Sequence, residues 1–350
     1  MLPMPWQPSL LAPLPASTYN PAMILVTGGA GFIGSNIVAA LDAQGRGPLV
    51  VCDRLRAGEK WRNIAKRELE DIVDPDEVFA FLKSAGGKVE AVIHMGAITS
   101  TTETDADLII ENNFRLSKRL WSWCAERGVR FIYASSAATY GDGSRGFDDD
   151  SAPGALAQFQ PMNAYGWSKQ VFDRWAVRAI ADGAPAPPQW AGVKFFNVYG
   201  PNEYHKGAQA SVVSHIFPEA QAGRPARLFT SHHPDYADGG QLRDFIYVDD
   251  AVAVVLWLLD HARTSGLFNC GTGEARSFAD LATAVFRALG REPDIEYVPM
   301  PEAIRDRYQY FTEARMDRLR AAGFDQLLTS LEDGVRAYVQ DYLATDDPYR

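Results

Sequence analysis

The chain has 350 residues, of which 47% are hydrophobic, so it is long enough to bury one large core or two moderate ones. Its 34 Lys and Arg against 44 Asp and Glu give a formal net charge of −10, which argues against a nucleic-acid-binding surface. Three cysteines, Cys52, Cys124 and Cys270, lie in hydrophobic segments without paired spacing. We therefore expect a cytoplasmic protein with no disulfide framework and no metal site.

The first 22 residues are rich in proline and contain no Lys or Arg, so they lack the positively charged start of a secretory signal. We expect residues 1–22 to be a flexible extension and the folded part to begin at Met23. The longest apolar stretch of the folded part, residues 251–260, is too short to span a bilayer and predicts a buried helix. No membrane association is expected.

From Met23 onward, short apolar runs alternate with longer helical patterns. The expected strands are 23–29, 49–53, 91–97, 130–136 and 192–200, and the clearest helical patterns between them are 34–45 and 106–128. Such alternation is typical of an α/β fold with a Rossmann-type, doubly wound parallel sheet and helices on both faces. The pattern then loosens, which predicts a smaller, mixed α/β C-terminal lobe.

The segment ILVTGGAGFIGSNIV places Gly28, Gly31 and Gly34 in a G-x-x-G-x-x-G spacing between the first strand and the first helix. Glycines suit a dinucleotide there because the turn is tight, the backbone must approach a pyrophosphate, and the helix N-terminus offers unpaired N–H groups. A glycine-rich turn alone is weak support, since any strand-to-helix turn can use glycine. The second strand, however, ends about 20 residues later at Asp53, where a carboxylate is expected to meet the adenosine ribose.

The residues after Asp53 bear on the choice between the two nicotinamide cofactors. An acidic residue at this place favours NAD, whereas nearby cations accommodate the 2′-phosphate of NADP. Arg54, Arg56 and Lys60 follow Asp53, and the planar guanidinium of arginine suits a phosphate. We therefore predict NADP, with NAD as the alternative, although a solvated basic loop would explain the same residues.

These patterns divide the chain into two parts. Residues 23–200 are expected to form an NAD(P)-binding Rossmann domain, to which some later segments return. Residues 201–350 are expected to form mainly a substrate-binding lobe, although the helical patterns at 277–290 and 330–344 can pack on either part.

A candidate catalytic pair lies in the segment NAYGWSKQVFDRWAV. Tyr165 and Lys169 are four residues apart at the start of an amphipathic helix, so both side chains lie on one face. A neighbouring ammonium favours the phenolate, so the pair suits removal of a hydroxyl proton while a hydride leaves the same carbon. A Tyr and a Lys on a helix face occur often by chance, but Ser136, at the end of the preceding strand, adds a hydroxyl that can hold the reacting oxygen.

Glycine turn, strand-end serine and Y-x-x-x-K in this order resemble the extended short-chain dehydrogenase/reductases that act on nucleotide sugars. RDFIYVDDAV (243–252) and FNCGTGEARSF (268–278) resemble C-terminal motifs of that group. Within it, the chain is most similar to the ADP-L-glycero-D-manno-heptose 6-epimerase family, and the likeness covers nearly everything from Met23 onward. The segments that carry it are TGGAGFIGSNIV, ENNFRLSKRL, YASSAATYG, FFNVYGPNEYHKG, RYQYFTEA and RAAGF.

This resemblance implies a role for Lys206. The family moves a hydride from C6 of the heptose to bound NADP and returns it to the other face of the ketone. A carbonyl that has swung to the opposite side leaves the reach of Tyr165, so a second proton-transfer group is useful. The resemblance implies that Lys206 is this group, and a neutral fraction of it then requires a lowered pKa. Two alternatives remain: Lys206 binds the substrate diphosphate as a point charge, or it is simply solvated.

The resemblance completes the expected set of site residues. Catalysis is assigned to Tyr165, Lys169, Lys206 and Ser136. Cofactor binding is assigned to Gly28, Gly31, Phe32, Ile33, Gly34, Asp53, Arg54, Lys60, Met95, Gly96, Ala97, Ile98, Thr99, Asn113, Tyr165 and Lys169. Substrate binding is assigned to Ser136, Asn197, His215, Phe229, Arg243 and Tyr308, although Arg243 could instead pair with Asp244 or Asp249, and His215 could be a structural core histidine.

The chain departs from the family pattern at three places. The family usually has a serine after the lysine and glycine, whereas Ala208 has no hydroxyl to offer. Residues 231–241 enlarge a loop expected near the adenosine end of the substrate. An Asp-Arg pair ends the second strand in place of the more usual Asp-Asn. These departures bear on substrate contacts and on the choice between NAD and NADP.

Three other functions compete with the heptose epimerase. A nucleotide-sugar 4,6-dehydratase needs Asp-Glu where this chain has Ala137-Ala138, so we rank it low. A UDP-hexose 4-epimerase is the main alternative, because it rotates the whole ketosugar and would leave Lys206 idle. A non-catalytic dinucleotide sensor has no need of Ser136, Tyr165 and Lys169 together.

By resemblance we also expect a homo-oligomer that serves lipopolysaccharide core assembly.

Overall fold

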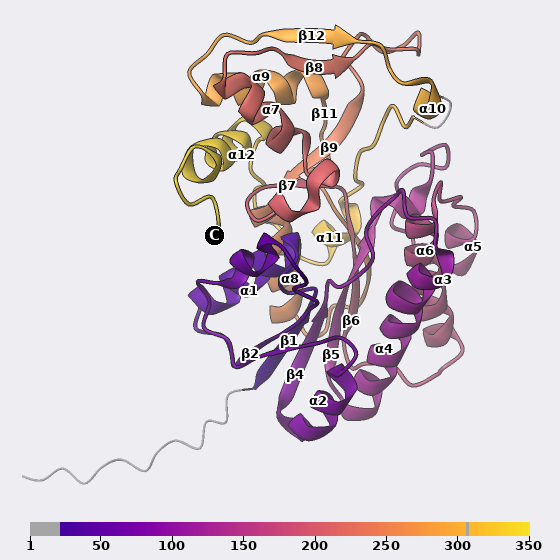
Figure 1. Cartoon of the computed structure of the whole chain (residues 1–350). Helices are drawn as coiled ribbons and strands as arrows, with labels where there is room; N and C mark the ends of the chain where they lie inside the picture. Colours follow the sequence, from indigo (N-terminus) through magenta and orange to yellow (C-terminus); the bar gives the residue numbers. More distant parts are fainter. Residues whose placement is uncertain (1–21, 306–307) are drawn as a thin grey trace, which may run out of the picture.

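The computed structural model describes residues 22–305 and 308–350, so the extension predicted at residues 1–22 lies almost wholly outside the described residues. A large sheet flanked by helices forms one part of the molecule, and a smaller lobe with two short sheets lies over one end of it (Figure 1). None of the helices in the described chain combines the length and apolar character that spanning a bilayer requires.

The large sheet has seven parallel strands in the order β10-β6-β5-β4-β1-β2-β3. Every residue of β1, β2, β6 and β10 is buried, as expected for strands covered by helices on both faces. The predicted Rossmann-type α/β fold is confirmed. The strands are β1 (Met23–Thr27), β2 (Leu49–Cys52), β3 (Asp71–Val73), β4 (Val89–His94), β5 (Arg130–Ser136), β6 (Trp190–Phe195) and β10 (Gly266–Cys270).

Helices cover both faces of this sheet (Figure 1). On one face, α1 (Phe32–Ala43) packs against α8 (Val248–Asp260), which contains the apolar run 251–260. On the other face lie α4 (Leu116–Arg127) and α6 (Ala164–Ala181). The remaining elements of this part are η1 (Glu59–Ile64), α2 (Val78–Ala85), η2 (Gly86–Lys88), α3 (Ala106–Ile109), η3 (Ile110–Arg115), η4 (Ala137–Tyr140) and α5 (Pro153–Leu156).

The smaller lobe contains one three-stranded and one two-stranded sheet. In the first, β9 (Leu242–Tyr247) pairs with β7 (Asn197–Tyr199) in parallel and with β11 (Ala275–Ser277) in antiparallel fashion. In the second, β8 (Ala226–Phe229) and β12 (Ile295–Val298) run parallel. The lobe is completed by η5 (Tyr204–Gln209), α7 (Val212–Gln221), α9 (Phe278–Ala288), α10 (Glu302–Arg305), α11 (Asp317–Ala321), α12 (Leu331–Tyr338) and η6 (Val339–Leu343).

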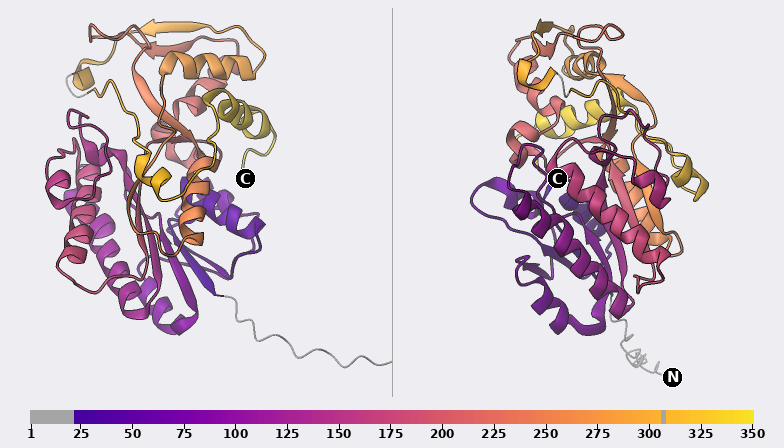
Figure 2. Two further views of the ribbon diagram at one scale, coloured as in Figure 1. Left: turned by 180° about the vertical axis from the view of Figure 1, so that it is seen from behind. Right: turned by 90° about the vertical axis from the view of Figure 1, so that its right-hand side faces the viewer.

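The last residues of the chain join the two parts. Residues 347–350 run back from the smaller lobe and end beside α1 (Figure 2). The guanidinium of Arg350 forms an ion pair with Asp249 on α8, and its second nitrogen lies 2.8 Å from that carboxylate. The hydroxyl of Tyr204, on η5, donates to the carbonyl oxygen of Pro348 at 2.8 Å. This segment therefore fixes η5 against the Rossmann part.

A buried ion pair ties α6 to the sheet. Asp173 on α6 and Lys194 on β6 have fully buried side chains, and the lysine Nζ lies 2.9 Å from Asp173 Oδ2. Tyr133 and Ser135 of β5 donate hydroxyl hydrogen bonds to the same carboxylate at 2.9 and 2.7 Å. The Lys194 ammonium also donates to Thr139 at 2.8 Å. Both charges are thus paired and hydrogen-bonded, as a buried pair requires.

Replacing Lys194 with methionine is expected to lower the free energy of unfolding by about 3–5 kcal/mol, because Asp173 would keep its charge in an apolar interior without a partner. Urea denaturation followed by tryptophan fluorescence measures this loss. The double variant Lys194→Met/Asp173→Asn removes both charges, so it should be more stable than the single variant. Equal instability of the two variants would contradict the view that an unpaired charge is the cause.

Candidate active site

The glycine turn between β1 and α1 forms the floor of the site. Gly28 has a φ of +63°, and a Cβ there would lie 2.6 Å from the Gly96 nitrogen, which is the main chain after β4. A Cβ on Gly34 would lie 2.1 Å from the Gly28 carbonyl oxygen. Gly31 differs, because its Cβ would meet only the Gly28 carbonyl group, at 3.0 Å for the oxygen, and would otherwise face the cavity. The fold itself thus requires Gly28 and Gly34, whereas Gly31 leaves space for a ligand at the N-terminus of α1.

A cavity of about 580 Å³ leads from this turn past the end of β2. On its wall, Asp53 accepts a hydrogen bond from the Ala30 nitrogen at 2.9 Å and pairs with the Lys60 ammonium at 2.6 Å. The Arg54 guanidinium, on the same wall, lies 2.6 Å from Asp76. A carboxylate and two cations therefore face the place where an adenosine ribose and its substituents would lie in this fold.

The main cavity, of about 760 Å³, joins the glycine turn to the ends of β4, β5 and β6. Four predicted catalytic residues line it from three segments: Ser136 ends β5, Tyr165 and Lys169 begin α6, and Lys206 lies on η5. Most of the predicted cofactor residues line the same cavity: Gly28, Gly31, Phe32, Ile33, Gly34, Asp53, Lys60, Met95, Gly96, Ala97 and Thr99. Ile98 and Arg54 line the adjoining cavity.

Tyr165 and Lys169 occupy the first turns of α6, which Asn163 caps by accepting a main-chain N–H at 2.8 Å. The Lys169 ammonium donates to the Ala134 carbonyl oxygen at 2.9 Å, and burial lowers the pKa of Lys169 to about 8. Burial raises the pKa of Tyr165, and a hydrogen bond with Ser136 opposes that rise. At neutral pH a mostly charged lysine therefore lies one helical turn from a phenol whose proton is held by its surroundings.

Lys206 occupies a different edge of the cavity. Its Nζ lies 4.9 Å from the centre of the Phe32 ring, at the start of α1, and 3.9 Å from Glu203 Oε2. Burial lowers the pKa of Lys206, and the Glu203 carboxylate opposes this fall. Ala208, where the family was expected to have a serine, lines the cavity with a methyl group. The lowered pKa that a proton-transferring lysine needs is therefore present, with burial as its cause.

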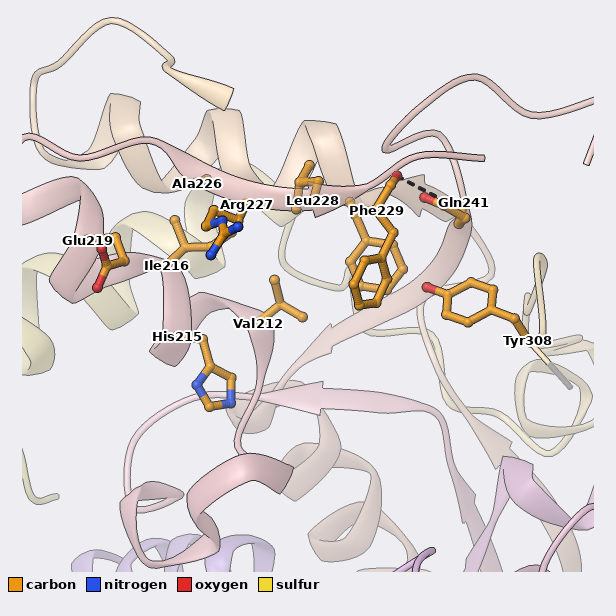
Figure 3. Close-up of a pocket in the computed structure, with 11 residues that line it drawn as sticks. Val212, His215, Ile216, Glu219, Ala226, Arg227, Leu228, Phe229, Gln241 and Tyr308 are labelled. Atoms are coloured by element: carbon orange, nitrogen blue, oxygen red, sulfur yellow. Dashed lines mark hydrogen bonds between the residues drawn. The ribbon is translucent and has the colours of Figure 1, made fainter. Parts of the chain in front are cut away.

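A third cavity, of about 400 Å³, lies in the smaller lobe (Figure 3). The predicted substrate residues His215, Phe229 and Tyr308 line it. The Phe229 and Tyr308 rings meet edge to face with their centres 6.4 Å apart, and Gln241 donates to the Phe229 carbonyl oxygen at 3.4 Å (Figure 3). Aromatic walls with a few polar groups suit a flat heterocycle such as a nucleotide base.

Two predicted binding residues, Asn113 and Arg243, contact protein groups, and a third, Asn197, is exposed. Asn113 is buried, accepts from the Ile98 nitrogen at 2.7 Å and donates to the Ile98 carbonyl at 2.9 Å, so it fixes the segment after β4. The Arg243 guanidinium donates to main-chain oxygens of Leu242, at 2.8 Å, and Gln309. Asn197 is exposed on β7. Direct ligand contacts of these three residues stay predictions.

Asp244 and Asp249, the two aspartates suggested as ion-pair partners of Arg243, bind other groups. Asp244 accepts main-chain hydrogen bonds from Thr272, Gly273 and Ala314 at 2.6 to 2.9 Å. Asp249 pairs with Arg350, as described above. Arg243 lies 5.5 Å from the centre of the Tyr308 ring and therefore supports one wall of the third cavity.

Comparison with known proteins identifies the family to which this site belongs. Residues 24–271 match the model of the NAD dependent epimerase/dehydratase family, which is well over half of the chain. The chain belongs to that family. It is 53% identical over 330 residues to the ADP-L-glycero-D-manno-heptose-6-epimerase of Nitratidesulfovibrio vulgaris (strain DP4), covering 93% of this chain and 100% of the relative.

Two solved structures of nucleotide-sugar epimerases are also similar. The Helicobacter pylori ADP-L-glycero-D-manno-heptose-6-epimerase is 26% identical with a TM-score of 0.73, covering 93% of this chain and 97% of that one. The Thermus thermophilus UDP-glucose 4-epimerase, in complex with NAD, is 26% identical with a TM-score of 0.68. That match covers 91% of this chain and 97% of the other.

The structure adds cavity residues to this epimerase/dehydratase site that sequence reasoning missed. His205 and Gln209, next to Lys206 in the chain, line both cofactor-side cavities. Burial lowers the pKa of His205 to about 4, so its ring is neutral at physiological pH. Gln241 and Phe278 line the third cavity. His205 and Gln209 lie within three residues of Lys206 in the sequence, and this proximity could have suggested them as site residues. Gln241 and Phe278 reach the third cavity only through the tertiary fold.

Gly34→Ala and Gly31→Ala are expected to separate the needs of the fold from those of the cofactor. The first substitution forces a clash with the Gly28 carbonyl oxygen, so we expect a lower melting temperature and loss of copurified dinucleotide. The second leaves the fold nearly unchanged but weakens dinucleotide binding roughly tenfold or more, which corresponds to about 1.4 kcal/mol. Differential scanning fluorimetry and titration with cofactor measure the two effects.

Gly87→Ala is the matched control for this pair, because a Cβ there meets nothing within 4 Å. It should change neither the melting temperature nor cofactor affinity. A Gly31→Ala protein as unstable as Gly34→Ala would mean that Gly31 serves the fold rather than the ligand.

Proposed function

We propose that this protein converts ADP-D-glycero-D-manno-heptose into ADP-L-glycero-D-manno-heptose, inverting C6 by transient oxidation and reduction. The relative from N. vulgaris that carries this activity in its name supports the substrate. The observation that carries the proposal is that Tyr165 and Lys206, two groups able to transfer a proton, line one cavity from different elements. A reaction that needs only one such group gives no role to Lys206.

The two groups lie toward different strands of the large sheet. Tyr165 stands beside Ser136, at the end of β5, whereas Lys206 packs on Phe32, which follows β1. Strand β4 separates β5 from β1 in the sheet. A ketone held over the end of β4 can therefore present its oxygen to one group in one orientation and to the other group after it has turned.

This geometry divides the proton transfers between two residues. The residues of the glycine turn would hold a nicotinamide dinucleotide, which would supply the hydride chemistry at C6 of the sugar. In one orientation of the substrate, Tyr165 exchanges the proton of the C6 oxygen while Ser136 holds that oxygen by a hydrogen bond. In the other orientation, Lys206 exchanges it. Return of the hydride to the opposite face gives the inverted carbinol, and the net redox change is zero.

Lys169 is assigned to the support of Tyr165. Its ammonium, fixed on the Ala134 carbonyl, adds positive charge one helical turn from the phenol and so favours the phenolate. Because burial brings the pKa of Lys169 to about 8, this support should weaken as the pH rises above that value. The residue therefore acts on the proton of Tyr165 rather than on the sugar.

The third cavity is assigned to the adenine of the substrate. Phe229 and Tyr308 offer aromatic surface to the base, and His215, which lines the same cavity, offers a ring nitrogen. Arg243, whose guanidinium lies 5.5 Å from the centre of the Tyr308 ring, is assigned to the diphosphate by resemblance. Asn197 is assigned to the sugar hydroxyls by resemblance alone.

The remaining parts of the proposal concern cofactor, assembly and setting. The family description and the NAD-bound relative support a nicotinamide cofactor. We assign NADP, because Arg54 and Lys60 place two cations on the wall of the adenosine-side cavity. We also propose a cytoplasmic homo-oligomer whose product feeds lipopolysaccharide core assembly, as the family resemblance implies.

UDP-hexose 4-epimerisation is the second candidate, favoured by the likeness to the T. thermophilus UDP-glucose 4-epimerase. In that reaction the whole ketosugar ring rotates and one tyrosine serves both orientations. The two candidates therefore differ in whether Lys206 is needed.

NMR of ADP-D-glycero-D-manno-heptose incubated with the purified protein tests the proposal. Wild type is expected to invert C6 without added cofactor, because the hydride returns to the same substrate molecule. Tyr165→Phe and Lys206→Met are each expected to reduce the rate by about 10²–10⁴-fold, the usual contribution of general acid–base catalysis. Substrate affinity, measured by calorimetry, should change much less.

Three outcomes contradict this assignment in different ways. Normal inversion by Lys206→Met would reduce that lysine to a binding charge. A Lys206→Met enzyme that binds the substrate more weakly but keeps its rate constant would likewise show that the lysine only binds. An inactive wild type would reject the heptose substrate, and UDP-hexoses would be tried next.

Arg54→Met is expected to weaken NADP binding about 10- to 100-fold, the effect of losing a charged hydrogen-bonding partner worth about 1.5–3 kcal/mol. Affinity for NAD should stay nearly unchanged, since NAD has no 2′-phosphate. Fluorescence titration with the two reduced cofactors measures the ratio. Arg46→Met, which removes a guanidinium paired with Asp260 away from these cavities, is the matched control. An equal loss for both cofactors would exclude a specific role of Arg54 toward the phosphate.

A further inference from the structure

We propose that Glu203 is a positioning residue for Lys206: its buried carboxylate holds the lysine side chain over Phe32 and keeps a proton on Nζ between turnovers. This inference rests on the proposed function, which gives Lys206 the role of a proton-transfer group. Glu203 was not among the residues predicted from the sequence. Its side chain is fully buried, and its Oε2 lies 3.9 Å from Lys206 Nζ.

Burial raises the pKa of Glu203, and Lys206 and the hydrogen bonds from Ser211 oppose that rise. Oε2 accepts a hydrogen bond from the Ser211 nitrogen at 2.6 Å, and Oε1 accepts one from the Ser211 hydroxyl at 2.5 Å. Ser211 is the N-cap residue of α7, so the carboxylate also lies at the positive end of that helix. Hydrogen bonds donated to a carboxylate favour its charged form. Ser211 thus fixes the carboxylate 3.9 Å from Lys206 Nζ, where the carboxylate and the ammonium each oppose the effect of burial on the pKa of the other.

The other ionisable groups near the pair do not replace this charge. His205, on the same short helix, is neutral, since burial lowers its pKa to about 4. Lys60, from η1, is paired with Asp53. Tyr204 and Tyr338, on the η5 and α12 side, have pKa values raised by burial and keep their protons. Phe32, from α1, contributes only its ring face. Glu203 thus supplies the carboxylate that compensates the ammonium.

This compensation matters because Lys206 must both give and take a proton. When the hydride adds to the carbonyl carbon, an N–H bond of Lys206 breaks and an O–H bond forms, which leaves a neutral amine beside the Glu203 carboxylate. In the reverse step the amine lone pair takes the hydroxyl proton as the hydride leaves, and Glu203 stabilises the ammonium. Burial alone would favour the neutral amine, so the resting enzyme would lack the protonated Lys206 that donates to the carbonyl oxygen. The carboxylate keeps both forms accessible.

The first test measures the proton affinity of Lys206 without any substrate. Competitive acylation with acetic anhydride across a range of pH, read by mass spectrometry of the peptide that contains Lys206, gives the titration midpoint of that amine in the full-length protein. Glu203→Gln is expected to lower the midpoint by roughly one pH unit, since it removes an opposite charge within about 4–6 Å. Glu203→Asp, which keeps the charge, should restore most of the difference.

Controls separate this effect from general damage. Glu332→Gln removes a half-exposed carboxylate that pairs with Arg276 in the smaller lobe, and it should leave the midpoint unchanged. If Glu203→Gln does not fold, Ser211→Ala gives the same information, because loss of the hydroxyl donor weakens the carboxylate charge and should move the midpoint in the same direction. An unchanged midpoint in every folded variant would overturn the proposal.

The second test is the pH profile of epimerisation. At pH values above the titration midpoint of wild-type Lys206, the Glu203→Gln enzyme should lose about tenfold in rate relative to wild type and recover as the pH is lowered, because one pH unit corresponds to a tenfold change in the protonated fraction. A merely structural role would lower the rate equally at every pH, and this result would overturn the proposal. If wild type shows no epimerisation at all, the proposed function fails, yet the acylation midpoints still decide whether Glu203 controls the charge of Lys206.

Discussion

The close approach of the main chains at Gly28 and Gly96 is the constraint around which the site is arranged. A Cβ on Gly28 would lie 2.6 Å from the Gly96 nitrogen, and one on Gly96 would lie 3.1 Å from the Gly28 nitrogen. This contact lies between β1 and β4, where successive connections turn in opposite directions across the sheet and a crevice opens at the carboxyl ends of the strands. Gly28 and Gly96 line both cofactor-side cavities, and the main cavity extends from them to Ser136 at the end of β5.

Lys169 and Lys206 both face this crevice, and the fold controls their charge by the same physical means. Burial lowers the pKa of Lys169 and of Lys206, and a buried carboxylate one helical turn away raises it again. For Lys169 that carboxylate is Asp173, and for Lys206 it is Glu203. Each carboxylate is fixed in turn, Asp173 by Tyr133, Ser135 and Lys194, and Glu203 by Ser211. The charge state of the site therefore depends on residues behind the cavity as much as on those that line it.

The sequence predicts the Rossmann part well because its information is local. Short apolar runs, a glycine turn and an acidic strand end predict most strands of the large sheet and the cofactor side. The pairing order comes from the structure, and the strand expected at 192–200 is divided into β6 of the large sheet and β7 of the smaller lobe. Lys206 could be proposed only from a resemblance, since nothing in NVYGPNEYHKG states that the loop folds back over Phe32. Glu203 and His205 were within three residues of that lysine and were still missed, because their importance lies in burial. Gln241 and Phe278 reach the third cavity through tertiary packing that no local pattern encodes.

The loop that carries Lys206 is held by three other segments, two of them distant in the sequence. Asn202 donates to the Ser35 hydroxyl of α1 at 3.0 Å, and Tyr204 donates to Pro348 at 2.8 Å. Glu203 binds the start of α7. A turning ketone needs donors that stay in place, because a proton can move only within hydrogen-bond distance. Under the proposed function Lys206 is the second of these groups, and its loop is held by α1, the C-terminal segment and α7. Two of these contacts join residues more than 100 positions apart, so no pattern within residues 197–207 records them.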